Sequence, residues 1–85
     1  GYTHKLLTGR KALFPSLNQP GGMSRFLTPK ESAHDLMEAS HAGTAIAIAT
    51  GLALASTTTE QQAIVIAIVG DGALVEGMSM EGLNF

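Results

Sequence analysis

Hydrophobic and polar positions are arranged differently in the two halves of the chain. The first forty residues have no sustained period. They are interrupted by Pro15, Pro20, Gly21, Gly22 and Pro29. This half is therefore predicted to be mostly loop. One signal competes with that prediction, because Thr28-Pro29-Lys30-Glu31 is a capping box with Pro at the first helical position. If local propensity decides, a helix begins there.

A long apolar stretch follows Ser40, with small residues between the aliphatic ones. Residues 43–55 are rich in helix formers and too numerous for one strand, so a buried helix is predicted over them. Gly51 lies inside this stretch and costs about 1 kcal/mol relative to Ala, unless a neighbour needs the space. Residues 57–62 are polar and are expected to connect the helix to the next element.

Residues 63–69 form a continuous apolar run in which β-branched side chains dominate. Such a run is typical of a central parallel strand that is covered on both faces. It ends at Gly70-Asp71-Gly72, and residues 73–83 have the composition of a helix. The order helix, strand, glycine-rich turn and helix predicts an α/β fold in which helices flank a parallel sheet.

Composition and charge narrow the functions open to this chain. Its 85 residues are 45% hydrophobic and 14% charged, with no Cys and a formal net charge of -2. The five Lys and Arg residues do not cluster, which argues against nucleic-acid binding. The lack of Cys excludes disulfides and a Cys nucleophile. A domain of this size buries only about 60% of the surface that its unfolded chain exposes, so a self-sufficient enzyme is not expected.

The uncharged residues 39–59 have the length of a membrane span but not its composition. They contain Ser, Thr, Gly and His, and small Ala stands largely in place of Leu or Phe, which favours a packed internal helix and no membrane partner. The chain starts with neither a signal peptide nor an initiator Met. We therefore expect a piece of a longer protein, incomplete at both ends, whose remaining residues complete the core.

Asp71 is the strongest candidate for chemistry. It lies between two glycines where the predicted strand ends, and ligands of open α/β sheets bind at the carboxyl ends of strands. The glycines allow backbone N–H groups to approach phosphate oxygens, but a carboxylate there repels phosphate unless a cation lies between them. Mg²⁺ prefers oxygen ligands and bridges to phosphates. Asp71 is thus a candidate Mg²⁺ ligand, and an ordinary Asp-Gly turn is the alternative.

His41 is the second candidate. It is predicted at the start of the Ala-rich helix, and its small neighbours Ser40 and Ala42 leave the ring accessible. A helix N-terminus disfavours imidazolium, so a neutral ring there can hydrogen-bond a ligand. The alternative is a histidine without a function. His4 and His34 have no partner at metal-ligand spacing and are interpreted as structural or surface residues.

Several segments in order together resemble one enzyme family. They are His4-Lys5, Leu7-Thr8-Gly9-Arg10, Phe14-Pro15, residues 19–22, Phe26, Glu31-Ser32, Asp35, His41, Gly70-Asp71-Gly72-Ala73, Gly77-Met78 and Glu81. Their order resembles the 1-deoxy-D-xylulose-5-phosphate synthase family, one of the transketolase-like thiamine diphosphate enzymes. The Leu-Thr-Gly-Arg segment distinguishes this family from transketolase itself. The resemblance extends over nearly the whole chain.

The resemblance implies roles for individual residues. In the family, the Asp of Gly-Asp-Gly binds Mg²⁺ and the next two residues contact the cofactor's diphosphate. This implies Asp71 as the metal ligand, and Gly72 and Ala73 as diphosphate contacts. The family's Gly-His-Ser segment touches thiamine diphosphate and corresponds to residues 40–42, where this chain keeps the His but replaces both neighbours.

The resemblance also implies an activity and partners. Residues 1–85 would be part of the N-terminal domain that binds Mg²⁺ and diphosphate, in a homodimer located in a bacterial cytoplasm or a plastid. The enzyme would join a two-carbon unit from pyruvate to glyceraldehyde 3-phosphate, with loss of CO2, to make a precursor of isoprenoids and thiamine. The family's second metal ligand and its activating Glu lie outside these residues. The alternatives are a transketolase-type enzyme with other substrates and a non-catalytic α/β module that packs against a partner.

Overall fold

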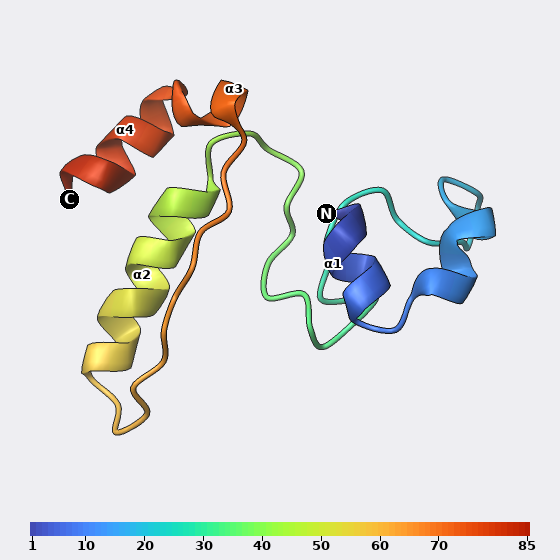
Figure 1. The fold of residues 1–85 in the computed structure, drawn as a ribbon, viewed down its shortest axis with the longest axis horizontal. Helices are drawn as coiled ribbons and strands as arrows, with labels where there is room; N and C mark the ends of the chain where they lie inside the picture. Colours follow the sequence, from blue (N-terminus) through green and yellow to red (C-terminus); the bar gives the residue numbers. More distant parts are fainter. The chain divides into compact units, whose positions relative to one another are not determined.

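The computed structural model describes all 85 residues and contains helices joined by turns and extended segments (Figure 1). The helices in chain order are α1 (Tyr2–Leu7), the 3₁₀-helix η1 (Lys11–Ser16), α2 (Ala45–Thr57), α3 (Asp71–Leu74) and α4 (Gly77–Asn84). None of them has the length and apolarity that crossing a membrane requires. The chain divides into two compact units, Gly1–Ser40 and His41–Phe85, and a different kind of contact holds each together.

The predicted parallel sheet is absent, which corrects the α/β prediction. Residues 63–69 have no regular secondary structure and make no backbone–backbone hydrogen bond. Ile64 and Ile68 are 91% and 92% exposed, the opposite of a strand covered on both faces. The physical reason is that a strand satisfies its N–H and C=O groups only by pairing, and no other segment of this chain pairs with it.

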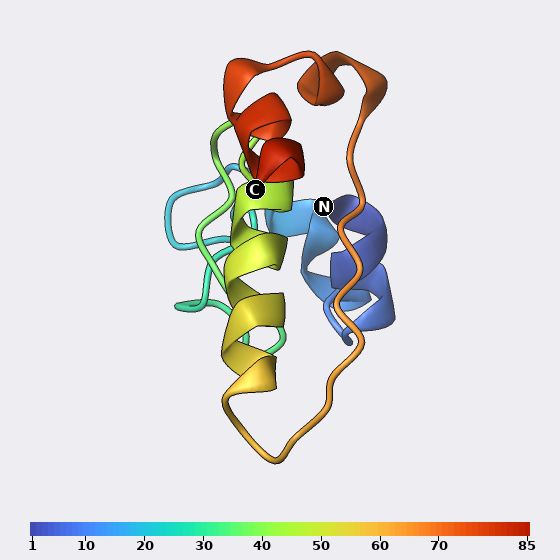
Figure 2. The ribbon, with the colours of Figure 1, turned by 90° about the vertical axis from the view of Figure 1, so that its left-hand side faces the viewer.

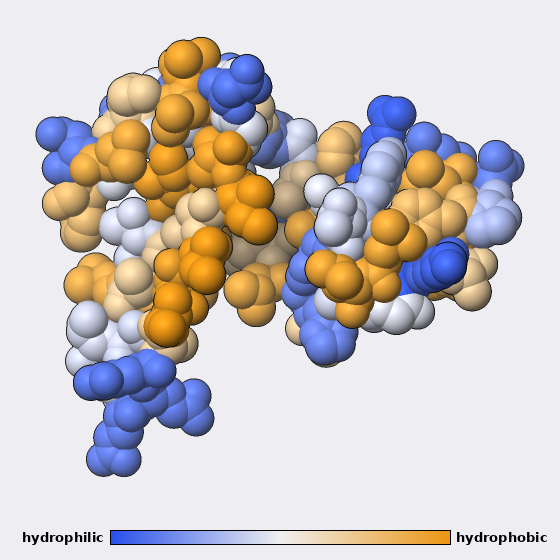
Figure 3. Space-filling view, viewed as in Figure 1, coloured by the Kyte–Doolittle hydropathy of each residue, from blue (hydrophilic) through white to orange (hydrophobic).

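The second unit leaves much of its apolar surface uncovered. Figures 1 and 2 show the chain reversing after α2 and running back, as the extended residues 63–69, to α3. Apolar side chains gather over this unit in the space-filling view, and hydrophilic ones mark the turn after α2 (Figure 3). The large exposed apolar residues here include Leu54, Ile64, Ile66, Ile68, Val75, Leu83 and Phe85.

Helix α2 confirms the predicted helix but not its burial, because none of its residues is buried. It begins at Ala45 rather than at residue 43. Gly43 has φ +78°, which is outside the helical region, so the helix cannot include it. A Cβ atom at Gly43 would lie 2.7 Å from the Cβ of Glu76, so glycine also permits a close approach of the chain before α4.

The helix predicted over residues 73–83 is divided into α3 and α4. Glu76 has an extended backbone, with φ −66° and ψ 143°, and forms the N-cap of α4. The hydroxyl of the fully buried Ser79 lies 2.8 Å from the carbonyl oxygen of Ala73 and 3.3 Å from that of Gly43. Ser79 therefore joins the end of α3 to the segment before α2, and this contact stabilises the break between the two short helices.

Charged side chains, rather than an apolar core, hold the first unit together. Apart from α1 and η1, which the sequence pattern does not predict, residues 1–40 are loop as expected. Met23 is its only buried hydrophobic residue, whereas Lys5, Arg10 and Asp35 are all buried. Since buried charges require partners, these side chains together with Glu31 form one cluster, which we call the buried charge cluster.

Arg10 lies at the centre of the buried charge cluster. It donates two parallel hydrogen bonds to Asp35, from Nη1 to Oδ2 and from Nη2 to Oδ1, each of 2.7 Å. Its Nη1 also lies 3.0 Å from Oε1 of Glu31, and Nζ of Lys5 lies 2.7 Å from the same oxygen. Two cations thus face two anions in bidentate and charge-assisted geometry, which offsets the cost of removing them from water.

The helix that the capping box favours at Thr28 does not form, and residues 29–31 are a turn within the loop predicted for this half of the chain. In a capping box the Glu carboxylate would turn back to the N–H of Thr28. Here Glu31 instead accepts hydrogen bonds from Lys5, Arg10 and the N–H of Ser24, and the N–H of Thr28 donates to Asp35 at 3.1 Å. The Glu31 carboxylate and the Thr28 N–H, which would have capped the helix, are therefore hydrogen-bonded within the buried charge cluster instead.

Pairing shifts the pKa values of the cluster. The hydrogen bonds from Arg10 hold the pKa of Asp35 well below its usual range, and the bond to Asp35 raises the pKa of Arg10. Burial raises the pKa of Glu31, but the hydrogen bonds from Lys5, Ser24 and Arg10 outweigh it and the pKa is lowered. Carboxyls with depressed pKa values stabilise the fold above their unfolded pKa of about 4, and this stabilisation is lost as the pH falls toward the folded value.

Residues 1–40 are therefore expected to lose stability as the pH falls below about 4. Near neutral pH, Asp35→Asn leaves Arg10 buried beside a neutral amide, so this unit should unfold at a lower urea concentration than in the wild type. The difference should narrow below about pH 4, because Asp35 of the unfolded wild-type chain then gains a proton while the folded, paired carboxylate does not. The measurement is urea unfolding followed by NMR at the amides of Ser24 and Thr28. Glu60→Gln, at an exposed carboxylate without a hydrogen bond or ion pair, is the control. A difference between Asp35→Asn and the wild type that does not change with pH would contradict the pairing.

Two glycines in helices provide a matched test of how α2 and α4 pack. Gly51→Ala should stabilise α2 by about 0.5–1 kcal/mol, because a Cβ atom there meets no atom within 4 Å. Gly82→Ala should give no such gain, because its Cβ atom would lie 2.8 Å from Cγ2 of Ile46. The helical circular dichroism of the 85-residue chain measures both. An equal gain in the two variants would mean that α4 does not pack closely on α2.

Candidate functional site

Asp71 is the first residue of α3, and it is exposed. Gly70 precedes it as the N-cap, with an extended backbone of φ −69° and ψ 152°. Oδ1 of Asp71 accepts a hydrogen bond from the N–H of Gly72 at 2.9 Å, and no ion pair or further hydrogen bond engages the carboxylate. The second carboxylate oxygen is therefore open to a cation.

Gly72 and Ala73 follow Asp71 in the same short helix. A Cβ atom at Gly72 would meet nothing within 4 Å, so the backbone is open on that side and a phosphate group can approach it. Ala73 is half-buried, and its carbonyl oxygen is occupied by the hydroxyl of Ser79. The three predicted diphosphate and metal residues thus lie within one helical turn, two exposed and one partly covered.

Asp71 can serve as one ligand of a Mg²⁺ ion, with a single carboxylate oxygen. Mg²⁺ takes six oxygen ligands, commonly one or two carboxylates with phosphate oxygens and waters. No group of three or more His, Cys, Asp or Glu side chains gathers anywhere in the structure. Asp71 can therefore supply one carboxylate oxygen, and a complete site needs oxygens that these side chains do not provide.

His41 lies in a bend before α2 rather than on the helix. Thr44 is the N-cap of α2, and its hydroxyl donates to the carbonyl oxygen of His41 at 3.2 Å. The residue is exposed, and the ring makes no hydrogen bond or ion pair. Because the effect of a helix dipole fades within one turn, the argument from the helix N-terminus loses its basis here. The exposure of the His41 ring is the remaining property that suits ligand binding.

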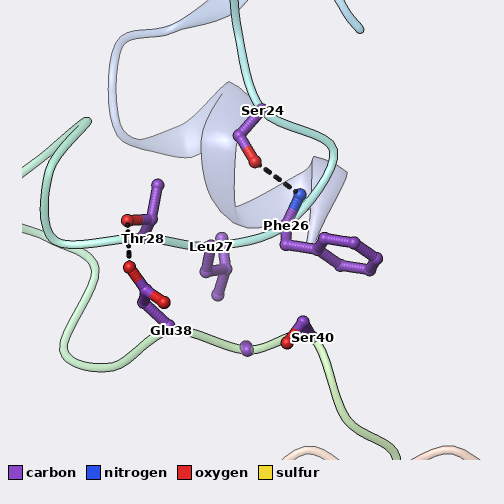
Figure 4. Close-up of a pocket in the computed structure, with 7 residues that line it drawn as sticks. Ser24, Phe26, Leu27, Thr28, Glu38 and Ser40 are labelled. Carbon is purple, nitrogen blue, oxygen red and sulfur yellow. Dashed lines mark hydrogen bonds between the residues drawn. The ribbon is translucent and has the colours of Figure 1, made fainter.

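Ser40 lines a small pocket within the first unit (Figure 4). The pocket has a volume of about 190 Å³. Its lining residues are Ser24, Phe26, Leu27, Thr28, Glu38, Ala39 and Ser40. Residues 24–28 form one wall and residues 38–40 the other, and Figure 4 shows Glu38 and Ser40 on the second wall. A backbone hydrogen bond of 3.1 Å from Ala39 to Leu27 joins the walls.

The structure brings only some of the predicted site residues together. Residues 71–73 share one turn of α3, and His41 and Ala42 are neighbours in the exposed segment before α2. No hydrogen bond or ion pair joins His41 to Asp71. Ser40 ends the first unit and lines its pocket. The residues expected to contact the cofactor therefore belong to several separate segments of the chain.

The buried charge cluster is the feature that the sequence pattern does not reveal. In the sequence, Glu31 is also the last residue of the capping box, whereas Lys5, Arg10 and Asp35 stand out only as positions of the family resemblance. Charged residues in a predicted loop ordinarily indicate a solvated surface. The spacing of four between Glu31 and Asp35 in a chain with so few charges was the one available signal, and it does not identify the partners.

Comparison with known proteins agrees with the resemblance in the sequence. A family model described as 1-deoxy-D-xylulose-5-phosphate synthase matches residues 1–85. Proteins named 1-deoxy-D-xylulose-5-phosphate synthase are similar over 98% of this chain, with identities of 48% in Porphyromonas gingivalis, 49% in Rhodococcus erythropolis and 51% in Rhodococcus jostii. The chain spans 13% of the length of each of these relatives. On this similarity, the chain belongs to the 1-deoxy-D-xylulose-5-phosphate synthase family.

Proposed function

We propose that these residues are part of the N-terminal cofactor domain of a thiamine diphosphate-dependent and Mg²⁺-dependent transferase, a 1-deoxy-D-xylulose-5-phosphate synthase. The observation that carries the proposal is the family match over residues 1–85. The reaction converts pyruvate and glyceraldehyde 3-phosphate to 1-deoxy-D-xylulose 5-phosphate and CO2. The complete enzyme is a homodimer of a bacterial cytoplasm or a plastid.

In this function Asp71 holds Mg²⁺, and the backbone of Gly72 and Ala73 contacts the diphosphate. The exposed carboxylate with one open oxygen and the open backbone at Gly72 support these roles. A cation bound to Asp71 offsets the repulsion between this carboxylate and the diphosphate. When bound, thiamine diphosphate supplies the carbanion chemistry, while these residues anchor and orient it.

His41 contacts the cofactor through a hydrogen bond from its ring. The exposed ring, which has no partner within the chain, supports this role. Ser40 and Ala42 on either side are small, so they leave room for a ligand beside the ring. Ser40 contributes a hydroxyl where the family pattern has Gly, and Ala42 lacks the hydroxyl of the family's Ser.

Replacement of the proposed metal ligand tests this assignment in the full-length protein. Asp71→Ala is expected to weaken the Mg²⁺-dependent binding of thiamine diphosphate by about 100-fold or more, because loss of even an indirect partner of a metal costs 10–100-fold. Isothermal titration calorimetry at fixed Mg²⁺ measures the change. Glu60→Ala, which removes an exposed carboxylate elsewhere in the chain, is the matched control. Unchanged affinity in Asp71→Ala would refute the metal role.

Product analysis tests the reaction itself. The full-length protein, incubated with ¹³C-labelled pyruvate, glyceraldehyde 3-phosphate, thiamine diphosphate and Mg²⁺, is expected to release CO2 and form 1-deoxy-D-xylulose 5-phosphate. NMR spectroscopy of the labelled carbons identifies both products. Turnover only with a different donor or acceptor would instead indicate a transketolase-type enzyme. A protein that binds no thiamine diphosphate under any condition would be a non-catalytic module.

A further inference from the structure

The buried charge cluster holds one wall of the pocket that Ser40 lines. The N–H groups of Ser24 and Thr28, both in that wall, donate to Glu31 at 2.8 Å and to Asp35 at 3.1 Å. Nζ of Lys5 also donates to the carbonyl oxygen of Ser24. The backbone at both ends of residues 24–28 is thus held by buried charges, although these residues form no helix or strand.

Arg10 is the one side chain that contacts both carboxylates of the cluster. Its guanidinium bonds to Asp35 through two nitrogens and to Glu31 through Nη1, so it sets the separation of the two carboxylates. The side chain is only 6% exposed, and its buried Nε has no hydrogen-bond partner. Lys at this position would keep the charge but lose the planar fork that reaches two partners at once.

Two hydrogen bonds join residues 24–28, which the cluster holds in place, to the segment on the other side of the pocket that ends at Ser40. The N–H of Ala39 donates to the carbonyl oxygen of Leu27 at 3.1 Å. The hydroxyl of Thr28 donates to Glu38 at 3.4 Å, as Figure 4 shows. No other backbone–backbone hydrogen bond holds residues 36–40. The position of this segment therefore depends on residues 24–28, which in turn depend on the cluster.

We infer that Arg10 is a positioning residue for the cofactor contact at Ser40. It acts through Glu31 and Asp35 on residues 24–28, and through them on the segment that ends at Ser40. The inference rests on the proposed function, because it needs Ser40 to belong to the segment that contacts thiamine diphosphate. Arg10 itself touches no ligand, and its effect is on where the contact lies rather than on the chemical step.

The test replaces Arg10 with Lys in the full-length protein. Arg10→Lys is expected to raise the dissociation constant of thiamine diphosphate about tenfold, the lower end of the range for loss of a supporting partner. Since the chemical step is untouched, kcat at saturating cofactor should stay within about twofold of the wild type. Calorimetry and steady-state kinetics measure the two quantities. Lys11→Arg, a conservative exchange at an exposed cation outside both walls, is the control and should change neither.

A structural readout is made without cofactor. Hydrogen exchange at the amide of Ala39 should be faster in Arg10→Lys than in the wild type and unchanged in Lys11→Arg. A lower melting temperature in Arg10→Lys with an unchanged dissociation constant and unchanged exchange at Ala39 would overturn the inference, because Arg10 would then only stabilise the fold.

A milder variant covers the case in which Arg10→Lys does not fold. Thr8→Val removes the hydroxyl that accepts a 2.8 Å hydrogen bond from Nη2 of Arg10, and it should shift affinity and exchange in the same direction by less. No shift in either quantity would overturn the inference. If the wild type binds thiamine diphosphate and the variants bind equally well, the inference fails while the proposed function stands. If the wild type does not bind it, the proposed function fails and the inference with it.

Discussion

The pairing of Arg10 with Asp35 and Glu31 is the interaction on which the first forty residues depend. Only one hydrophobic side chain is buried there, and Phe14, Leu17 and Leu27 are half-buried, so this unit has no enclosed apolar core. Charges removed from water destabilise a fold unless each has a partner, and here bidentate and charge-assisted hydrogen bonds provide one. The same carboxylates accept hydrogen bonds from backbone N–H groups of a loop. The cluster thus satisfies backbone groups that a helix or sheet would satisfy in other folds.

The second unit depends on close contact between small residues instead. Gly43 and Gly82 allow the chain before α2 and the helix α4 to approach other backbone and side-chain atoms, and Ser79 satisfies carbonyl groups at the junction. These contacts cover little of the apolar surface. A helix that is apolar all round, such as α2, is normally enclosed by other structure. The exposed isoleucines of residues 63–69 add to the same uncovered surface.

The proposed cofactor residues lie where the chain changes direction. Ser40 is at the end of the first unit, His41 is in the bend before α2, and Asp71 is where the extended segment becomes α3. Such positions leave backbone groups and short side chains accessible, which suits binding. They also have few local contacts of their own, so their placement depends on more distant interactions. The buried charge cluster provides such support for the segment before Ser40.

The sequence by itself determined the helix α2, the polar turn after it, the helical character of the residues after Asp71, and the family. Hydrogen bonds within a helix join residues four apart, so composition over a short window is enough to predict one. Tertiary structure alone decided the unpaired state of residues 63–69, the turn in place of a capped helix at Thr28, and the burial of Arg10. A strand needs a partner strand, and a buried charge needs an opposite charge that here lies more than twenty residues away. Neither partner can be identified from the local pattern, because both interactions join distant parts of the chain.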